Sequence, residues 1–182
     1  MQKNEEKRRN ICIYERKAVI LQAKLMYMKR IGLCVLVMLW AGSMIASLPE
    51  VRLRDIDGKE VNTAHIAQGK PVILSFFATW CKPCMRELEA INEVYDQWQE
   101  ETGVEMYIVS VDQGQDAQKV KPLVNGKGWE YHVLLDPNGT FKRAMNVQNI
   151  PHLLVLDSKG TIVYTHTGYT DGDESSIRTY LH

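Results

Sequence analysis

The sequence predicts an α/β domain over residues 49–182, in which helices cover both faces of a central mixed sheet. Three observations favour this class. Residues 72–78 are almost continuously apolar, which is typical of a strand buried on both faces. Residues 83–101 place apolar side chains at three- and four-residue steps, as an amphipathic helix does. Residues 153–157 and 161–166 flank a Ser-Lys-Gly turn, which predicts a hairpin.

The first elements of the domain are a hairpin, a strand and a long helix. Residues 51–55 alternate between polar and apolar side chains, and Asp57-Gly58-Lys59 turns the chain back toward Val61. This pattern predicts a small N-terminal hairpin. After the buried strand and the amphipathic helix, Gly103 is expected to end that helix. Residues 104–112 are mostly apolar and predict the next strand.

The second half of the domain continues the alternation of helix and strand. Residues 117–125 are helix-like and are followed by glycines, and residues 131–136 predict a strand closed by a Pro-Asn-Gly turn. Residues 141–145 predict a short helix. After the terminal hairpin, residues 173–181 predict a closing helix with an aspartate near its start. The order of these elements therefore gives three layers around a mixed sheet.

Composition and charge fit an ordinary globular domain. The chain has 182 residues, of which 45% are hydrophobic and 24% charged, so one domain with a sizeable core is expected. The net charge of zero hides an asymmetry, because residues 1–46 carry nine Lys and Arg against three Glu. The domain itself is acidic and has no basic stripe, which argues against nucleic acid as a partner.

An uncharged apolar run occupies residues 31–48, and Met28-Lys29-Arg30 precedes it. A basic start, an apolar run and small residues at its end are typical of an export signal. The run is also long enough to span a bilayer as an uncleaved anchor. We therefore expect a signal peptide or membrane anchor over residues 28–48. In both cases the basic flank sends residues 49–182 out of the cytoplasm, to the periplasm.

Residues 1–27 lie upstream of this predicted leader. We expect them to be an extension, and we interpret Met28 or Met26 as the true start of translation. The alternative is a real amphipathic extension. Cys12 and Cys34 are assigned no role, because the first falls in the extension and the second in the leader.

Two cysteines lie three residues apart in the run Trp80-Cys81-Lys82-Pro83-Cys84, after the buried strand and at the start of the long helix. The free N–H groups and the dipole at a helix N-terminus favour a thiolate. The thiolate is the form that attacks a disulfide, so the pair predicts redox chemistry. The alternatives are half of a zinc site, which would need further Cys or His ligands, and an inert structural disulfide.

The sequence Phe-Ala-Thr-Trp-Cys-Lys-Pro-Cys at residues 77–84, with Val-Gln-Asn-Ile-Pro at 147–151 and the strand after it, resembles the thioredoxin superfamily. More narrowly, it resembles the TlpA/ResA-like branch of exported thiol-disulfide oxidoreductases. The resemblance covers residues 48–182. It implies a thioredoxin-like three-layer sandwich with an N-terminal hairpin. It also implies an extra helix–strand unit between the cysteine helix and a cis-proline.

The order of the cysteines in the helix gives each a role. Cys81 lies nearest the free N–H groups, and its sulfur is expected to be the more exposed one and the attacking thiolate. Cys84 is expected to be shielded and to resolve the mixed disulfide. Pro83 suits the first helical turn, where its missing N–H costs nothing. Lys82 either adds positive charge beside the thiolate or is simply solvated. We expect Trp80, Lys82 and Pro83 to contact the substrate.

Three further site residues follow from the resemblance. Pro151 matches the cis-proline, and the backbone of Ile150 is expected to pair with the backbone of the substrate. Glu87 matches an acidic residue that this branch keeps near its cysteines. A buried carboxyl with a raised pKa could take the proton of Cys84 and return it. Thioredoxin itself has its acid on the preceding strand, where Ser75 stands here. The alternative is that Glu87 is a solvated helix residue.

Two positions depart from the pattern of the branch. Glu89 replaces a proline that kinks the helix in many relatives, so a straighter helix is expected here. His152 follows Pro151 where relatives often carry threonine. It could complete a Cys-Cys-His metal site, or it could be a partly exposed polar residue.

The leading functional hypothesis is an exported thiol-disulfide oxidoreductase that reduces the disulfides of other exported proteins. Because its compartment is oxidising, a membrane partner must supply electrons. The resemblance implies clients such as those of cytochrome c maturation. We also expect a monomeric domain with no cofactor and no metal. The alternatives are a copper- or zinc-handling protein using Cys81, Cys84 and His152, and a peroxiredoxin-like peroxidase. The second is disfavoured because Thr79 is two residues before Cys81 rather than three.

Overall fold

The computed structural model describes residues 48–181. The predicted extension over 1–27, the predicted leader apart from its last residue, and both Cys12 and Cys34 lie outside the described residues. Within the described part of the chain, no helix has the length and apolar character needed to cross a membrane.

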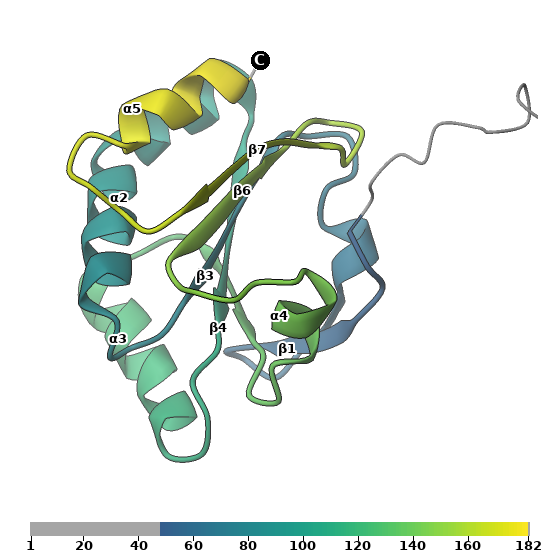
Figure 1. Cartoon of the computed structure of the whole chain (residues 1–182), viewed down its shortest axis with the longest axis vertical. Coiled ribbons are helices and arrows are strands. Elements are labelled where there is room, and N and C mark those ends of the chain that lie inside the picture. Colours follow the sequence, from purple (N-terminus) through teal and green to yellow (C-terminus); the bar gives the residue numbers. More distant parts are fainter. Residues whose placement is uncertain (1–47, 182) are drawn as a thin grey trace, which may run out of the picture. The chain divides into compact units, whose positions relative to one another are not determined.

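A seven-stranded mixed sheet forms the centre of the domain (Figure 1), with strand order β2-β1-β5-β4-β3-β6-β7. The strands β3, β4 and β5 are parallel to one another, whereas β1, β2, β6 and β7 join the sheet in antiparallel pairs. The bounds are β1 Arg52–Asp55, β2 Glu60–Asn62, β3 Val72–Phe77, β4 Glu105–Ser110, β5 His132–Leu135, β6 His152–Leu156 and β7 Ile162–Thr167.

Helices cover both faces of this sheet, which confirms the predicted three layers. Figure 1 shows α2, α3 and α5 together on one side and α4 on the other. The bounds are α2 Lys82–Thr102, α3 Val120–Lys127, α4 Thr140–Ala144 and α5 Glu174–Ile177. Short 3₁₀ helices accompany them: η1 Thr63–His65, η2 Asp116–Lys119 and η3 Arg178–Tyr180.

The central strand β3 divides the core into two clusters. All six of its residues are buried, and successive side chains point to opposite faces. Ile73 and Phe77 contribute to the cluster under α2, whereas Leu74 and Phe76 contribute to the cluster on the α4 side. By the same alternation, the side chain of Ser75 points toward α2. The continuous apolar run in the sequence therefore reflects a strand covered on both faces, as predicted.

The long helix α2 has the ends that the sequence predicts. Cys81 is its N-cap, a proline occupies the first turn, and Gly103 closes it with a left-handed backbone (φ 69°). The helix runs without interruption past Glu89. The carboxylate of Glu89 forms an ion pair with Lys127, which joins α2 to α3.

Two predicted helices differ in detail from the observed ones. The segment predicted at 117–125 is a 3₁₀ turn followed by α3, which includes Gly126 and ends at Lys127 before Gly128. The closing helix predicted at 173–181 is divided into α5 and η3. The predicted extra unit is present as α3 and β5, and β5 lies between β1 and β4 in the sheet.

Candidate active site at the cysteine pair

Cys81 and Cys84 lie where the central strand passes into the long helix. After β3, a three-residue loop carries the chain to Cys81, the N-cap of α2. The two cysteines form a disulfide with an S–S distance of 2.06 Å. The backbone N–H of Cys84 donates to Cys81 Sγ at 3.3 Å. This N–H is one of the free donors at the start of a helix, and it would stabilise negative charge on the same sulfur after reduction.

The two cysteines differ in exposure in the predicted direction. Cys81 is 5% exposed and Cys84 is fully buried. Both contribute to the core cluster under α2. The neighbouring Trp80 is 65% exposed, so its indole ring is free to contact another molecule. Both side chains are buried in the disulfide form, and Cys81 is the more exposed of the two.

A buried aspartate that no sequence motif marks fixes the loop before the cysteines. Asp112 follows β4 and is 1% exposed. Its carboxylate accepts hydrogen bonds from Thr79 N at 2.9 Å, from Thr79 Oγ1 at 2.8 Å and from Ser110 Oγ at 2.9 Å. Its position directly after a buried strand, beside the end of β3, was the available signal. Asp112 positions the loop that delivers Cys81.

Replacing Asp112 with alanine is expected to lower the free energy of unfolding by about 3 kcal/mol, because buried donors lose a charged acceptor. Disulfide exchange should slow as the loop loses its anchor. The control is Asp116→Ala, which removes an exposed pair with Lys119 and should change stability by less than about 0.5 kcal/mol. Urea unfolding of both variants tests this, and equal losses would contradict the anchoring role.

The predicted cis-proline is confirmed, since the Ile150–Pro151 peptide bond is cis. The carbonyl of Pro151 accepts a hydrogen bond from Gly168 N at 2.8 Å, which ties the loop to the end of β7. Ile150 and Trp80 both line one groove of about 380 Å³. The other residues that line it are Val111, Gln113, Gly139, Lys142, Gln148 and Asn149.

The structure thus brings together only some of the residues expected to contact substrate. Trp80 and Ile150 share the groove. Pro151 follows Ile150 in the chain but is not among the residues that line the groove. Lys82 and Pro83 are exposed in the first turn of α2, beside the cysteines but outside this groove. Their contacts with a substrate stay a prediction.

Glu87 is buried beneath the surface of α2, with an exposed fraction of 2%. Its Oε2 accepts a hydrogen bond from Ser75 Oγ at 2.7 Å. Burial raises the pKa of Glu87 from 4.5 to about 7, and the hydrogen bond from Ser75 opposes this only in part. The alternative of a solvated helix residue is therefore wrong. Ser75 does not titrate, but its hydroxyl holds the titratable carboxyl of Glu87 in place through this hydrogen bond.

His152 lies on the face of the sheet away from the cysteines. Its ring centroid is 6.4 Å from that of Phe76, which belongs to the α4-side cluster. Its Nδ1 lies 2.7 Å from Thr167 Oγ1, and burial lowers its pKa. Among residues 48–181, no group of three His, Cys, Asp or Glu side chains is placed to hold a metal ion. The Cys-Cys-His metal site is therefore not formed, and His152 is the partly buried polar residue of the alternative.

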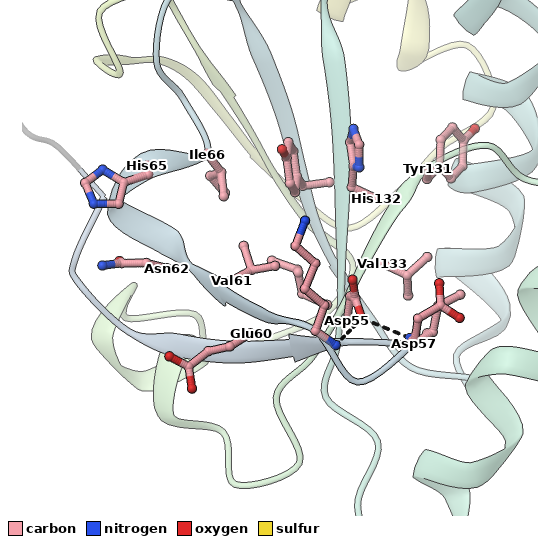
Figure 2. Close-up of a pocket in the computed structure, with 14 residues that line it drawn as sticks. Asp55, Asp57, Glu60, Val61, Asn62, His65, Ile66, Tyr131, His132 and Val133 are labelled. Atoms are coloured by element: carbon pink, nitrogen blue, oxygen red, sulfur yellow. Dashed lines mark hydrogen bonds between the residues drawn. The ribbon is translucent and has the colours of Figure 1, made fainter.

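A second pocket lies at the other end of the sheet. It has a volume of about 470 Å³ and lies among the N-terminal hairpin, η1 and the first residues of β5. Figure 2 shows His132 above the hairpin residues Asp55 and Val61, whereas the hydroxyl of Tyr131 donates to the carbonyl of Leu88 on α2 at 3.0 Å. The carboxylate of Asp55 accepts hydrogen bonds from the backbone of Asp57 and Lys59, so it serves the turn. Because β5 runs parallel to β3, its start lies far from the cysteines.

Comparison with known families agrees with this geometry. Residues 46–165 match the model of the AhpC/TSA family. The chain belongs to the AhpC/TSA family. Among curated proteins, it is 30% identical to the thiol-disulfide oxidoreductase ResA of Bacillus cereus over 133 residues, which is 73% of each chain. It is 32% identical to ResA of Bacillus anthracis over 115 residues, which are 63% of this chain. That match spans 64% of the length of the relative, less than two thirds of it.

Solved structures give the same fold. The solution structure of an uncharacterised thioredoxin-like protein from Porphyromonas gingivalis is 59% identical, with a TM-score of 0.66 over 74% of this chain and 88% of that one. The crystal structure of StoA from Bacillus subtilis is 24% identical and has a TM-score of 0.59 over 74% of this chain and 98% of its own. At that identity the likeness to StoA concerns the fold alone.

Proposed function

We propose that this protein is a thiol-disulfide oxidoreductase that acts outside the cytoplasm and reduces disulfides of exported proteins. The observation that carries the proposal is the Cys81–Cys84 disulfide at the N-terminus of α2, in a chain whose curated relatives are thiol-disulfide oxidoreductases. A first cysteine that is more exposed than the second, and a buried titratable carboxyl near the pair, suit such exchange.

The reaction begins with the reduced pair. The Cys81 thiolate attacks one sulfur of a client disulfide, forms a mixed disulfide and releases the other client sulfur as a thiolate. Cys84 then loses its proton and attacks Cys81 Sγ. The mixed disulfide breaks, and the second client thiolate leaves. Two electrons pass to the client, whose thiolates take up protons, and the Cys81–Cys84 disulfide is left. A membrane-bound dithiol donor would return the pair to its reduced form.

The groove beside the cysteines would hold the client chain. Trp80 offers an exposed apolar ring, Ile150 lines the groove, and the backbone of Ile150 would form main-chain hydrogen bonds to an extended client segment. Lys142 lines the groove, and within the described residues no acidic side chain does so. The groove therefore suits a client segment that is neutral or acidic around its cysteine.

Glu87 would act on the proton of Cys84. Burial of Cys84 disfavours its thiolate, so the second step needs a base close to that thiol. Glu87 lies one helical turn further along α2 on the same side, and its pKa of about 7 suits proton exchange near neutral pH.

The proposed location rests on the predicted leader at residues 28–48. Its test is to express the full chain with a C-terminal tag and treat intact cells with a thiol reagent that cannot cross the inner membrane. Labelling of reduced Cys81 in intact cells is the expected result. Labelling only after the cells are lysed would contradict an extracytoplasmic site.

Trapping tests the exchange reaction itself. In a Cys84→Ser variant, Cys81 can attack a client but the mixed disulfide cannot be resolved, so covalent complexes should accumulate. They should disappear on treatment with dithiothreitol, and mass spectrometry would name the clients. The control is the Cys81→Ser/Cys84→Ser double variant, which should trap nothing. Equal trapping by the double variant would contradict the proposal.

The peroxidase alternative is disfavoured by one contact. The hydroxyl of Thr79 donates to the buried Asp112 at 2.8 Å and so is already engaged in holding the loop. In a direct peroxide assay, we expect the reduced protein to consume hydrogen peroxide no faster than free cysteine does when the two are compared at equal thiolate concentration.

A further inference from the structure

Glu87 needs a route for its proton. Its carboxyl is 2% exposed, yet under the proposed function it takes up and gives back one proton in each cycle. A buried acid can do this only through a polar contact that reaches solvent. The polar groups between Glu87 and the sheet therefore determine how the proton from Cys84 reaches solvent in the second step of exchange.

The register of the sheet places a histidine close to this acid. Ser75 on β3 is directly opposite Leu153 on β6, and Leu153 is directly opposite His166 on β7. Residues directly opposite in a ladder have side chains on the same face. Ser75, the hydrogen-bond partner of Glu87, and His166 therefore lie on the α2 face, separated by one residue.

A small cavity lies between the acid and this histidine. Its volume is about 10 Å³, close to the space that one water molecule needs. Its lining consists of Glu87, Leu153, Tyr164, His166, Tyr169, Asp173, Glu174 and Ile177. His166 Nε2 lies 3.2 Å from Asp173 Oδ2, and about a third of each side chain is exposed. The cavity thus connects the buried acid to a pair that reaches the surface.

We propose that His166, held in place by Asp173, exchanges protons between Glu87 and solvent through one water molecule in this cavity. This inference rests on the proposed function. When Cys84 is deprotonated, its S–H proton goes to the carboxylate of Glu87. The water then takes this proton and passes one to the imidazole, which releases one to solvent. No electrons move in the relay.

The other polar groups around the cavity are less suited to the task. Burial raises the pKa of Tyr169 to about 12, so its hydroxyl stays neutral, and that hydroxyl donates to Glu174 Oε2 at 2.9 Å. Burial also raises the pKa of Tyr164. The negative charge of Asp173 adds to the raised pKa of Glu87. Histidine is the side chain type that gains and loses a proton most readily near neutral pH.

Two variants test the relay by the rate at which Cys84 resolves a pre-formed mixed disulfide, measured between pH 6 and pH 8. His166→Gln keeps a hydrogen-bond donor for Asp173, and we expect about a tenfold slower step. His166→Ala should be slowed similarly and should regain rate when free imidazole is added. The control, His132→Gln, changes an exposed histidine on β5 and should match the wild type.

The possible outcomes separate this inference from the proposed function. Slowed variants with imidazole rescue support the relay. If His166→Gln resolves as fast as the wild type, or if imidazole does not restore His166→Ala, then His166 only packs β7 against α5 and the relay is refuted. If the wild-type protein itself shows no exchange, it is the proposed function that fails.

Discussion

Replacing Cys81 with serine is expected to abolish disulfide exchange, leaving only the rate of the added reductant in an insulin reduction assay. A serine hydroxyl does not ionise near neutral pH and forms no disulfide, so the covalent intermediate is lost. Cys84 cannot substitute for it, because Cys84 is fully buried beneath the first turn of α2. The loss should therefore be complete rather than partial.

The informative comparison is with Cys84→Ser, which should still react once with a client and then stop. The same amount of each variant is mixed with an oxidised client, and covalent complexes are separated by non-reducing electrophoresis. Complexes are expected with Cys84→Ser and not with Cys81→Ser. If Cys81→Ser formed them through Cys84, the assignment of attacking and resolving cysteines would be reversed.

Replacing Glu87 with glutamine is expected to slow the resolving step by about 10²-fold and at the same time to stabilise the domain at pH 8. The pKa of Glu87 is raised to about 7 in the folded state, above its ordinary value of 4.5. Between pH 4.5 and pH 7, Glu87 therefore keeps its proton in the folded state but has lost it in the unfolded chain. As pH rises from 4.5 to 7, stability falls, and by pH 8 the charged, buried carboxylate costs about 3 kcal/mol.

Urea unfolding at pH 5 and pH 8 measures this effect. Wild-type protein should be less stable at pH 8 through Glu87, whereas Glu87→Gln should lose that part of the pH dependence while keeping an acceptor for Ser75 Oγ. Glu93→Gln, on the exposed side of the same helix, is the matched control and should change neither stability nor exchange. If Glu87→Gln resolved mixed disulfides at the wild-type rate and its stability kept the wild-type pH dependence, the proposed role of the Glu87 carboxyl would be wrong.

Much of the fold was predictable because its periodic patterns are strong. The apolar run ending at Phe77 and the apolar stripe of α2 each have one physical interpretation, and Gly103 ended the helix as expected. Short helices were predicted less well. Within residues 173–181 only Ile177 and Leu181 are buried, and the segment forms α5 and then η3.

The candidate site was predictable where a motif marks it and not where only tertiary contacts do. The cysteine pair follows from a short sequence pattern, whereas Pro151 and Glu87 follow from the resemblance to a known family. Asp112 and His166 come from other strands, and their roles depend on the register that places them beside Thr79 and Leu153. No local pattern reveals such a register. His152 was ambiguous for the same reason, because only the observed sheet shows which face it occupies.

The central claim is that the sulfur of Cys81 ionises easily, and the rate at which the reduced domain is alkylated by iodoacetamide between pH 4 and pH 10 tests it most directly. Mass spectrometry identifies the sulfur that reacts. The account predicts that Cys81 reacts first, with a midpoint at least about one unit below the ordinary cysteine pKa of about 8.5. A midpoint at that ordinary value, or first reaction at Cys84, would contradict it.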